Sequence, residues 1–307
     1  MTTTSTLAID PNDRGYVLVL HGGAGGRLGN LSDAELGDYR AGLRDAYAAG
    51  ETLLASGASA VDAVCAAVCR LEDNPLFNAG RGAALTGEGT VELDALVMNG
   101  AGRAGAVTNC SQARHPVLAA RAVMEHTAHV LLSSPSASLL AGWGLETVDP
   151  HWFVTDARIA QLERVRAGLE APLKHGTVGA AALDRAGHLA AATSTGGISG
   201  KAVGRVGDTP VVGAGTFAHD GVVALSCTGV GEAFLQGVVA HDVYARMAYA
   251  GQPLPVAVNA SLTQEVAVRG ADGGLVAVGA DGRVVVAHNS PMMYAAWRDG
   301  DTLRTQV

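Results

Sequence analysis

The stretch HGTVGAAALDRAGHLAAATSTGG, residues 175–197, decides the fold. Within it, residues 177–184 and 188–195 are two largely apolar runs on either side of a turn at Arg185–Gly187. Short apolar runs bounded by turn residues are typical of strands, so we predict a β-hairpin here. The segment before the hairpin, residues 170–176, has no apolar periodicity and predicts a linker.

The rest of the chain also alternates between strand and helix patterns. Further strands are predicted at 16–20, 91–98, 104–109 and 221–229, and a second hairpin at 275–288 with Asp281–Gly282 at its turn. Helices are predicted from Ser32 to about Ala55, from Ser59, from Pro116, and over 155–169, 231–249 and 255–269, with loops at 21–26 and 73–82. Hairpins beside helices favour an α+β fold in which helices cover antiparallel sheets.

Composition argues against several classes of protein. The 307 residues carry a net charge of −8 with no basic cluster, so we expect no nucleic-acid partner. No segment has the roughly 18 to 20 consecutive apolar residues of a membrane helix. Residues 1–15 lack the basic start and apolar run of a secretory signal, so we expect a cytoplasmic protein. The cysteines form no C-x-x-C motif, and we expect free, buried thiols at Cys65, Cys69, Cys110 and Cys227.

Glycine and threonine are concentrated between residues 175 and 231, in the clusters HGTVGA, TSTGG, GRVGD and SCTGVGE. Tight strands and turns explain one such cluster, but four together, with Arg205 and Asp208 between them, indicate a site. A threonine hydroxyl is a nucleophile only when a base takes its proton. Its own α-amine, with a pKa of about 7.7 to 8.0, is the most compact base. Thr177 would carry that amine if the chain were cut after Gly176.

The four clusters resemble the β-subunit of the plant-type L-asparaginases, also called isoaspartyl (β-aspartyl) peptidases, which are N-terminal nucleophile (Ntn) hydrolases. Upstream, HGGAG (21–25), NPLFNAGRGA (74–83) and ELDALVM (92–98) resemble the α-subunit of the same family, and NSPMMYAAW (289–297) resembles its C-terminal segment. The resemblance therefore covers nearly the whole chain, roughly residues 16 to 297.

This resemblance implies a four-layer αββα sandwich, formed by one domain of residues 1–307 that cleaves itself into pieces 1–176 and 177–307. It implies that two cleaved pairs associate. It also implies a small-molecule substrate: the side-chain amide of L-asparagine or of a β-aspartyl dipeptide is hydrolysed to give L-aspartate, without a catalytic cofactor.

The motifs also imply roles for single residues. Thr177 matches the nucleophile, Gly176 the residue before the cut, and Thr195 the threonine that positions the nucleophile. Thr228 and Gly229 match the pair that stabilises the oxyanion.

Substrate-binding roles follow from the same resemblance. Arg205 matches the residue that holds the substrate α-carboxylate, a role that suits its planar guanidinium. Asp208 and Gly231 match the groups that contact the substrate α-ammonium, and Asn78 matches a residue near the nucleophile.

Residues 71–81 resemble a loop that wraps a structural sodium ion in this family. Its ligands would be backbone carbonyl oxygens, so the side chains do not distinguish sodium from potassium. The matching positions are Leu71, Glu72, Asn74, Phe77, Ala79 and Arg81.

Some positions depart from the family pattern. Gly200 stands where asparagine is common, Val230 replaces a residue that is often polar, and Pro291–Met292 replace Glu-Gly. The linker before Thr177 is also short. Two alternatives stay open: a glycosylasparaginase-like hydrolase on the same fold, and an uncleaved, non-catalytic protein that binds small molecules.

Overall fold

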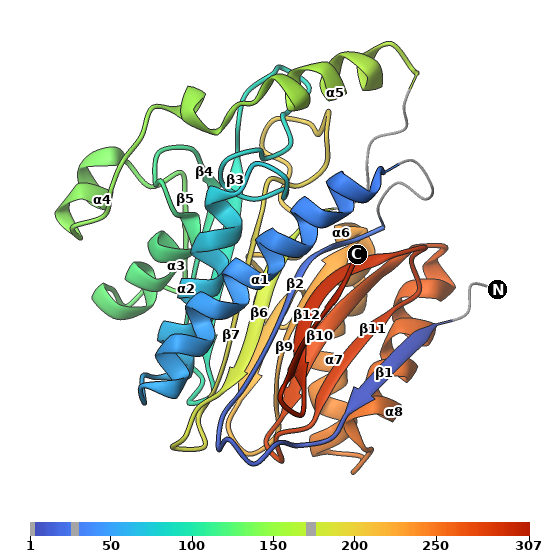
Figure 1. Ribbon diagram of the computed structural model, residues 1–307. Coiled ribbons are helices and arrows are strands. Elements are labelled where there is room, and N and C mark those ends of the chain that lie inside the picture. The colour runs from blue at the N-terminus through green and yellow to red at the C-terminus, as the bar shows by residue number, and fades with distance from the viewer. Residues whose placement is uncertain (1–3, 26–30, 170–175) are drawn as a thin grey trace.

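Two β-sheets lie face to face in the computed structural model, which describes residues 4–25, 31–169 and 176–307 (Figure 1). The larger sheet has the strand order β13 (Thr302–Gln306), β12 (Met293–Asp299), β2 (Val17–Ala24), β6 (Val178–Leu183), β7 (Leu189–Thr195), β3 (Leu93–Asn99), β4 (Ala104–Cys110) and β5 (Leu131–Ser133). The smaller has the order β1 (Ser5–Ile9), β11 (Val284–His288), β10 (Gly273–Gly279), β9 (Val223–Gly229) and β8 (Thr216–His219). Neighbouring strands are antiparallel, except β4 and β5, which are parallel.

Helices cover the outer faces of both sheets. The larger sheet is covered by α1 (Asp33–Ala55), α2 (Ala60–Asp73) and α3 (Pro116–His126). The smaller sheet is covered by α6 (Gly231–Gly237), α7 (Val239–Ala248) and α8 (Leu254–Ser261). The remaining helical segments are α4 (Ala137–Gly142), a 3₁₀ turn at Pro150–Phe153, α5 (Asp156–Arg166), a π-helical turn at Leu262–Val266 and a 3₁₀ turn at Ala267–Arg269.

Alternate residues of the central strands point to two different cores. Leu18 and Leu20 of β2 pack in the core beneath α1 and α2, whereas Val17 and Val19 pack in the core that includes the smaller sheet. This alternation follows from the period of two along a strand. It separates the residues of β6 and β7 in the same way, with Ala180 and Ala192 facing the helices. The face of these strands toward the other sheet is where the polar residues of the next section lie.

The predicted hairpins are confirmed. β6 pairs with β7 from Val178–Ser194 to Leu183–Leu189, and β10 pairs with β11. The predicted starts of the first two helices are also confirmed, because Ser32 and Ser59 each form a capping box.

Other predictions need correction. The segment 21–24, predicted as loop, continues β2, because β12 pairs with it as far as Ala24. The predicted helix 231–249 is two helices, separated by Val238 in the left-handed conformation with φ 45°. Cys69 is half-buried, whereas the other three cysteines are buried as expected. The predicted linker 170–176 lies outside the described residues except for Gly176.

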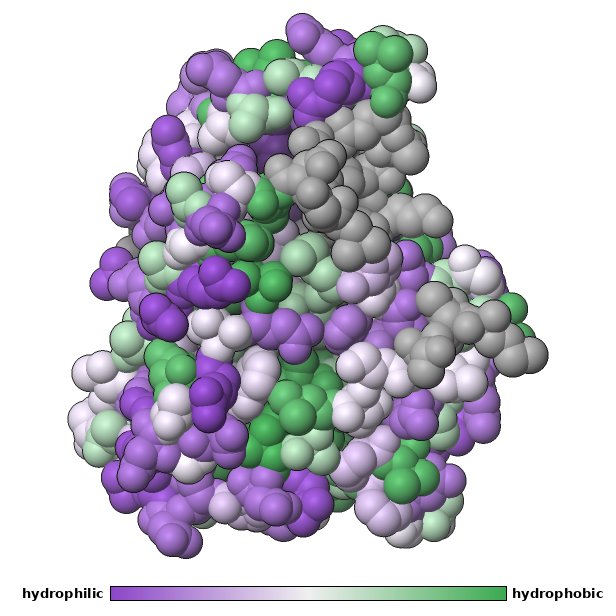
Figure 2. Space-filling view, turned by 45° about the vertical axis from the view of Figure 1, so that its right-hand side comes forward, coloured by the Kyte–Doolittle hydropathy of each residue, from purple (hydrophilic) through white to green (hydrophobic). Residues whose placement is uncertain are grey.

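Figure 2 shows a face on which polar residues predominate and apolar residues form separate patches. Among the described residues, no helix has both the length and the apolar character needed to cross a membrane.

Candidate active site

The three predicted threonines lie between the two sheets, where β6 begins and β7 and β9 end. Thr177 directly precedes β6, Thr195 is the last residue of β7, and Thr228 is next to last in β9. Because β6 and β7 are antiparallel, the start of one lies beside the end of the other, with Val178 opposite Ser194. The hairpin thus brings together two threonines that are far apart in sequence.

Thr177 and Thr195 are in direct contact. The Thr177 hydroxyl donates a hydrogen bond to Thr195 Oγ1 at 3.1 Å, and the Gly197 backbone N–H donates to the same oxygen at 2.9 Å. Thr177 is 8% exposed, so its hydroxyl lies at the boundary of the buried core. The second bond fixes Thr195 and so fixes the direction of the Thr177 hydroxyl.

Gly176 occupies a backbone position that other residues enter only with strain. Its φ is 123°, and a Cβ atom added there would lie 2.4 Å from the Cβ of Asn78. Gly23 also approaches it closely, since a Cβ added at Gly23 would lie 2.9 Å from the Gly176 Cα. Only glycine fits both the φ and the space. A cavity of about 340 Å³, lined by Gly176, Asn78, Tyr39 and Tyr294 among others, adjoins this position.

Asn78 joins the loop after α2 to the end of β7. Its side chain accepts a hydrogen bond from the Ala84 N–H and donates one to the Gly197 carbonyl, each at 2.6 Å. Its own carbonyl accepts from the Gly196 N–H at 3.0 Å. Since all these groups are occupied, Asn78 holds the loop that borders Thr195 and Gly176 in place.

Thr228 is fully buried on the opposite sheet. Its Oγ1 accepts a hydrogen bond from the Ala24 N–H at 3.2 Å, which joins the end of β2 to β9. A hydroxyl that accepts one bond still has a proton to donate. Thr228 can therefore donate to a developing negative charge, as predicted for it and for Gly229.

Arg205, Asp208 and Gly231 form a second cluster. A Cβ added at Gly231 would lie 2.8 Å from Arg205 Nη2 and 2.9 Å from Asp208 Oδ1, so a larger residue would displace these side chains from their positions. Arg205 also lies close to Gly197, whose added Cβ would be 3.1 Å from Arg205 Nη1. Because Gly197 contacts Thr195, the arginine cluster and the threonine pair adjoin.

The charged groups of this cluster are complementary to the α-carboxylate and α-ammonium of an amino acid. Asp208 is buried, and its Oδ2 has no hydrogen-bond partner among the described residues. Burial raises the pKa of Asp208 to about 7, although Arg205 opposes that effect. An ammonium group would satisfy this oxygen and favour the carboxylate form. A cation beside an unpaired carboxyl group suits a ligand that carries both an α-carboxylate and an α-ammonium.

Three charged residues of the site were not assigned a role from the sequence. Glu232 pairs with Arg205 at 2.9 Å, and its place directly after Gly231 was the available signal. Lys201 and Asp94 lie behind the cluster, where burial lowers the pKa of Lys201 and raises that of Asp94. The Lys201 ammonium donates to the Glu92 carbonyl at 2.7 Å. These three residues and Arg205 concentrate the charged side chains on one side of the site.

A buried polar chain, which the sequence did not predict, runs between the sheets below the threonines. His21 Nε2 lies 2.8 Å from Ser226 Oγ, which lies 2.7 Å from Thr193 Oγ1. The Thr216 hydroxyl donates to Thr193 at 2.6 Å. Burial lowers the pKa of His21 to about 3, so its ring is neutral at working pH. Thr193 and Ser226 each precede a site threonine by two residues and share its strand face.

The loop 71–81 folds back onto the end of α2. Its Arg81 N–H donates to the Glu72 carbonyl at 2.7 Å, and its Phe77 N–H donates to the Asn74 carbonyl at 3.1 Å. Leu71 O accepts from the Asn74 N–H at 3.3 Å. Within the described segments, the carbonyls of Phe77, Ala79 and Arg81 accept no hydrogen bond. Several carbonyl oxygens in one tight loop are chemically suited to a hard cation such as sodium.

The positions that depart from the family pattern are neighbours of the site residues, and Val230 lies between Gly229 and Gly231. Gly200 has φ 79°, Val230 immediately precedes α6, and the Met292 carbonyl accepts a hydrogen bond from the Gly25 N–H.

Similarity to known proteins covers the segments that carry this site. A protein-family model described as asparaginase matches residues 14–307. An isoaspartyl peptidase of Salmonella typhimurium is 45% identical over 306 residues, 95% of this chain and 98% of that protein. An isoaspartyl peptidase of Escherichia coli is 43% identical over 310 residues, 95% of each chain. An isoaspartyl peptidase/L-asparaginase of Bos taurus is 40% identical over 292 residues, 92% of this chain and 94% of that protein.

Proposed function

Because the chain belongs to the asparaginase family, we propose that it is a threonine hydrolase that cuts itself at Gly176–Thr177 and then hydrolyses the side-chain amides of L-asparagine and β-aspartyl dipeptides. The observation that carries the proposal is the contact at 3.1 Å between the Thr177 and Thr195 hydroxyls, directly after a glycine with φ 123°. The helix, sheet, sheet and helix order supports a four-layer αββα Ntn-hydrolase sandwich formed by one domain.

The first stage is self-cleavage. Thr177 Oγ1 attacks the Gly176 carbonyl carbon, and the peptide C–N bond breaks to leave an ester and a free Thr177 α-amine. Water then hydrolyses the ester, which releases the carboxylate of Gly176 and restores the hydroxyl. The glycine removes the side chain that would crowd this attack, and Asn78 holds the surrounding loop.

The second stage uses the new α-amine as the base. It takes the proton of Thr177 Oγ1 as that oxygen attacks the substrate side-chain carbonyl, and Thr195 keeps the hydroxyl in position. Thr228 and the Gly229 backbone donate to the oxyanion. Ammonia or an amino acid leaves with the proton, and water releases L-aspartate from the acyl-enzyme.

Arg205, Asp208 and Gly231 select the head of the substrate. The guanidinium binds the α-carboxylate, and Asp208 with the Gly231 backbone binds the α-ammonium. Asparagine and β-aspartyl dipeptides share this head and differ only in the leaving group, so this cluster accepts both.

We further propose that the loop carbonyls of Leu71, Glu72, Asn74, Phe77, Ala79 and Arg81 hold a structural sodium ion, which would stiffen the loop that carries Asn78.

The association of two cleaved pairs and the cytoplasmic location also stay predictions. Light scattering of the purified protein tests the association, with a mass of two pairs expected.

Thr177→Ala is expected to abolish both cleavage and hydrolysis, because one hydroxyl performs both attacks. Intact-mass spectrometry and an ammonia-release assay measure the two effects. Thr4→Ala, at a half-buried threonine directly before β1, is the control and should leave both unchanged. A Thr177→Ala chain that is still cut after Gly176 would contradict the proposed self-cleavage.

Arg205→Ala is expected to lower kcat/KM by about 10- to 100-fold, since a hydrogen bond to a charged group contributes about 1.5–3 kcal/mol. Arg205→Lys, which keeps the charge without the planar fork, should lie between the wild type and Arg205→Ala. Rates on L-asparagine, β-aspartyl dipeptides and glycosylated asparagine test the substrate class. Fastest turnover of the glycosylated substrate would favour the glycosylasparaginase-like alternative.

A further inference from the structure

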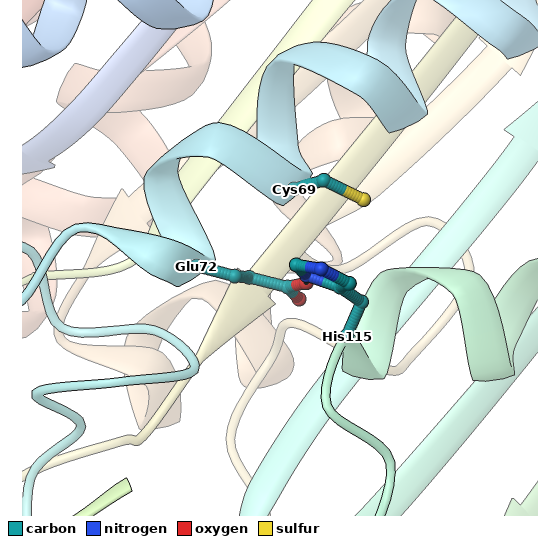
Figure 3. A group of neighbouring side chains, drawn as sticks. All are labelled: Cys69, Glu72 and His115. Atoms are coloured by element: carbon teal, nitrogen blue, oxygen red, sulfur yellow. The ribbon is translucent and has the colours of Figure 1, made fainter. Parts of the chain in front are cut away.

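A second group of reactive side chains lies outside the proposed active site. Figure 3 shows Cys69 and Glu72 on the last turns of α2 and His115 directly before α3, with the three side chains pointing toward a shared space. One ligand atom from each residue lies within 4.8 Å of the other two. Cys69 and Glu72 are three residues apart, so they share one face of the helix.

Glu72 is held so that one of its carboxylate oxygens points into this space. Its Oε1 accepts from the Ser194 hydroxyl at 2.6 Å and from the Val117 N–H at 3.0 Å. Its Oε2 faces His115 Nδ1 at 3.2 Å. The carboxylate is fully buried, so its orientation is set by these contacts rather than by solvent.

The other side of the His115 ring faces Asp73. Its Nε2 lies 3.8 Å from Asp73 Oδ2, and Arg114 holds the other Asp73 oxygen at 3.2 Å. A carboxylate behind a histidine is the arrangement that fixes the ring of a metal-binding histidine. The side chain of His115 is 16% exposed and Cys69 is half-buried, so the group can be reached from solvent.

We propose that Cys69, Glu72 and His115 form a binding site for a zinc-class divalent cation, with the fourth position open to water. A thiolate, a carboxylate and a neutral imidazole together offer two negative charges and mixed S, O and N ligands, a set that suits zinc and does not suit magnesium or calcium. In a tetrahedral site with bonds of about 2.0–2.3 Å, neighbouring ligand atoms lie about 3.3–3.8 Å apart. The separation of 3.2 Å between His115 Nδ1 and Glu72 Oε2 is close to that range, and all three ligand atoms lie within 4.8 Å of one another.

The competing explanation is that Glu72 only caps α3 and pairs with a protonated His115. The two explanations differ in the part played by Cys69, which the cap does not use. They also differ in the part played by Asp73. In the capping explanation Asp73 only pairs with Arg114, whereas in the proposed site it also supports His115. The proposed cation uses the Glu72 side chain, whereas the loop proposed for sodium uses the Glu72 backbone carbonyl.

Titration of the chelator-treated full-length protein with Co²⁺ tests the site, because a thiolate ligand gives cobalt a charge-transfer band in the near ultraviolet. We expect one Co²⁺ per chain with this band, and its loss when Zn²⁺ is added. Cys69→Ala should abolish the band, and His115→Asn, which can still donate to Glu72, should weaken binding at least about 10-fold. Asp73→Asn should weaken it by about 10- to 100-fold while all three ligands remain.

Two variants serve as matched controls. Cys65→Ala removes a buried thiol one turn earlier on α2, and His126→Asn removes a histidine at the far end of α3; both should bind Co²⁺ like the wild type. Absence of the band in the wild type would overturn the proposal. So would a band that survives Cys69→Ala, or one unaffected by His115→Asn. The readout does not involve hydrolysis, so its failure leaves the proposed function standing.

Discussion

At the scale of single residues, the buried carboxyl group of Asp208 lowers the stability of the fold when it is ionised, and the same group is predicted to bind the substrate ammonium. Its folded-state pKa of about 7 lies above the ordinary value of 3.8, chiefly because the carboxyl group is buried. Between these two values the folded protein holds a proton that the unfolded chain has lost. The stabilisation by the protonated group is therefore complete below pH 3.8 and is lost as pH rises through about 7.

Asp208→Asn is therefore expected to raise the melting temperature at pH 8, where the wild type buries a charge, and to change it little at pH 4. The same variant should lose most of its activity, because the amide cannot pair with the substrate ammonium. Differential scanning fluorimetry at both pH values measures the first effect. Asp301→Asn, at a carboxylate that is 99% exposed, is the control and should show no such pH-dependent difference. Equal shifts for Asp208→Asn at both pH values would contradict the burial argument.

The motifs predicted candidate site residues from the sequence, and the structure places Thr177 beside Thr195 and groups Arg205 and Asp208 around Gly231. Thr177 and Thr195 could be paired because one hairpin carries both. Asp94 and Lys201 could not be assigned, because their role depends on burial behind Arg205, which no local pattern reveals. The same holds for His115, whose partners Cys69 and Glu72 lie on another helix.

At the scale of elements, the chain of His21, Ser226 and Thr193 sets how the two sheets face each other. Three strands contribute one buried polar side chain each, and Ser226 Oγ is hydrogen-bonded to both His21 Nε2 and Thr193 Oγ1. Buried polar groups of this kind cost free energy when a partner is missing, so the chain favours one relative position of the sheets. That position holds Ser226 of one sheet against Thr193 of the other, and each of them lies two residues before a predicted site threonine.

Ser226→Ala is expected to lower the free energy of unfolding by about 1–3 kcal/mol, because it leaves His21 Nε2 and Thr193 Oγ1 each short of a partner. Its kcat should also fall, since Thr228 lies two residues away. Urea unfolding measures the first effect. Ser199→Ala is the control: Ser199 Oγ is buried without a partner among the described residues, so its removal should be neutral or stabilising. Equal losses in both variants would show that the chain has no special role.

Elements with a local signal were predicted well, and those fixed by distant pairing were not. The capping boxes at Ser32 and Ser59 and the turn at Asp281–Gly282 mark their elements in sequence. The extension of β2 depends on β12, which lies about 270 residues later in the chain. The break at Val238 could not be foreseen, because a β-branched residue rarely adopts positive φ.

At the scale of the whole molecule, the proposed cut divides a sheet whose strands interleave. In the larger sheet, β2 from the first piece lies between β12 and β6 from the second, and β7 lies beside β3 from the first. In the smaller sheet, β1 from the first piece pairs with β11 from the second. The two pieces therefore cannot separate without breaking the hydrogen bonds of both sheets.

Because of this interleaving, folding is a first-order process for the uncut chain and requires the association of two chains after the cut. The uncut Thr177→Ala chain should refold with a rate and yield that do not depend on protein concentration. The cut protein must bring two chains together, so its refolding yield after dilution from denaturant should fall as concentration is lowered. Recovery of native fluorescence over a hundredfold range of concentration measures both, and concentration-independent recovery of the cut protein would contradict the prediction. A cut molecule that unfolds in dilute solution is thus lost, so its working lifetime depends on how slowly it opens rather than on its equilibrium stability.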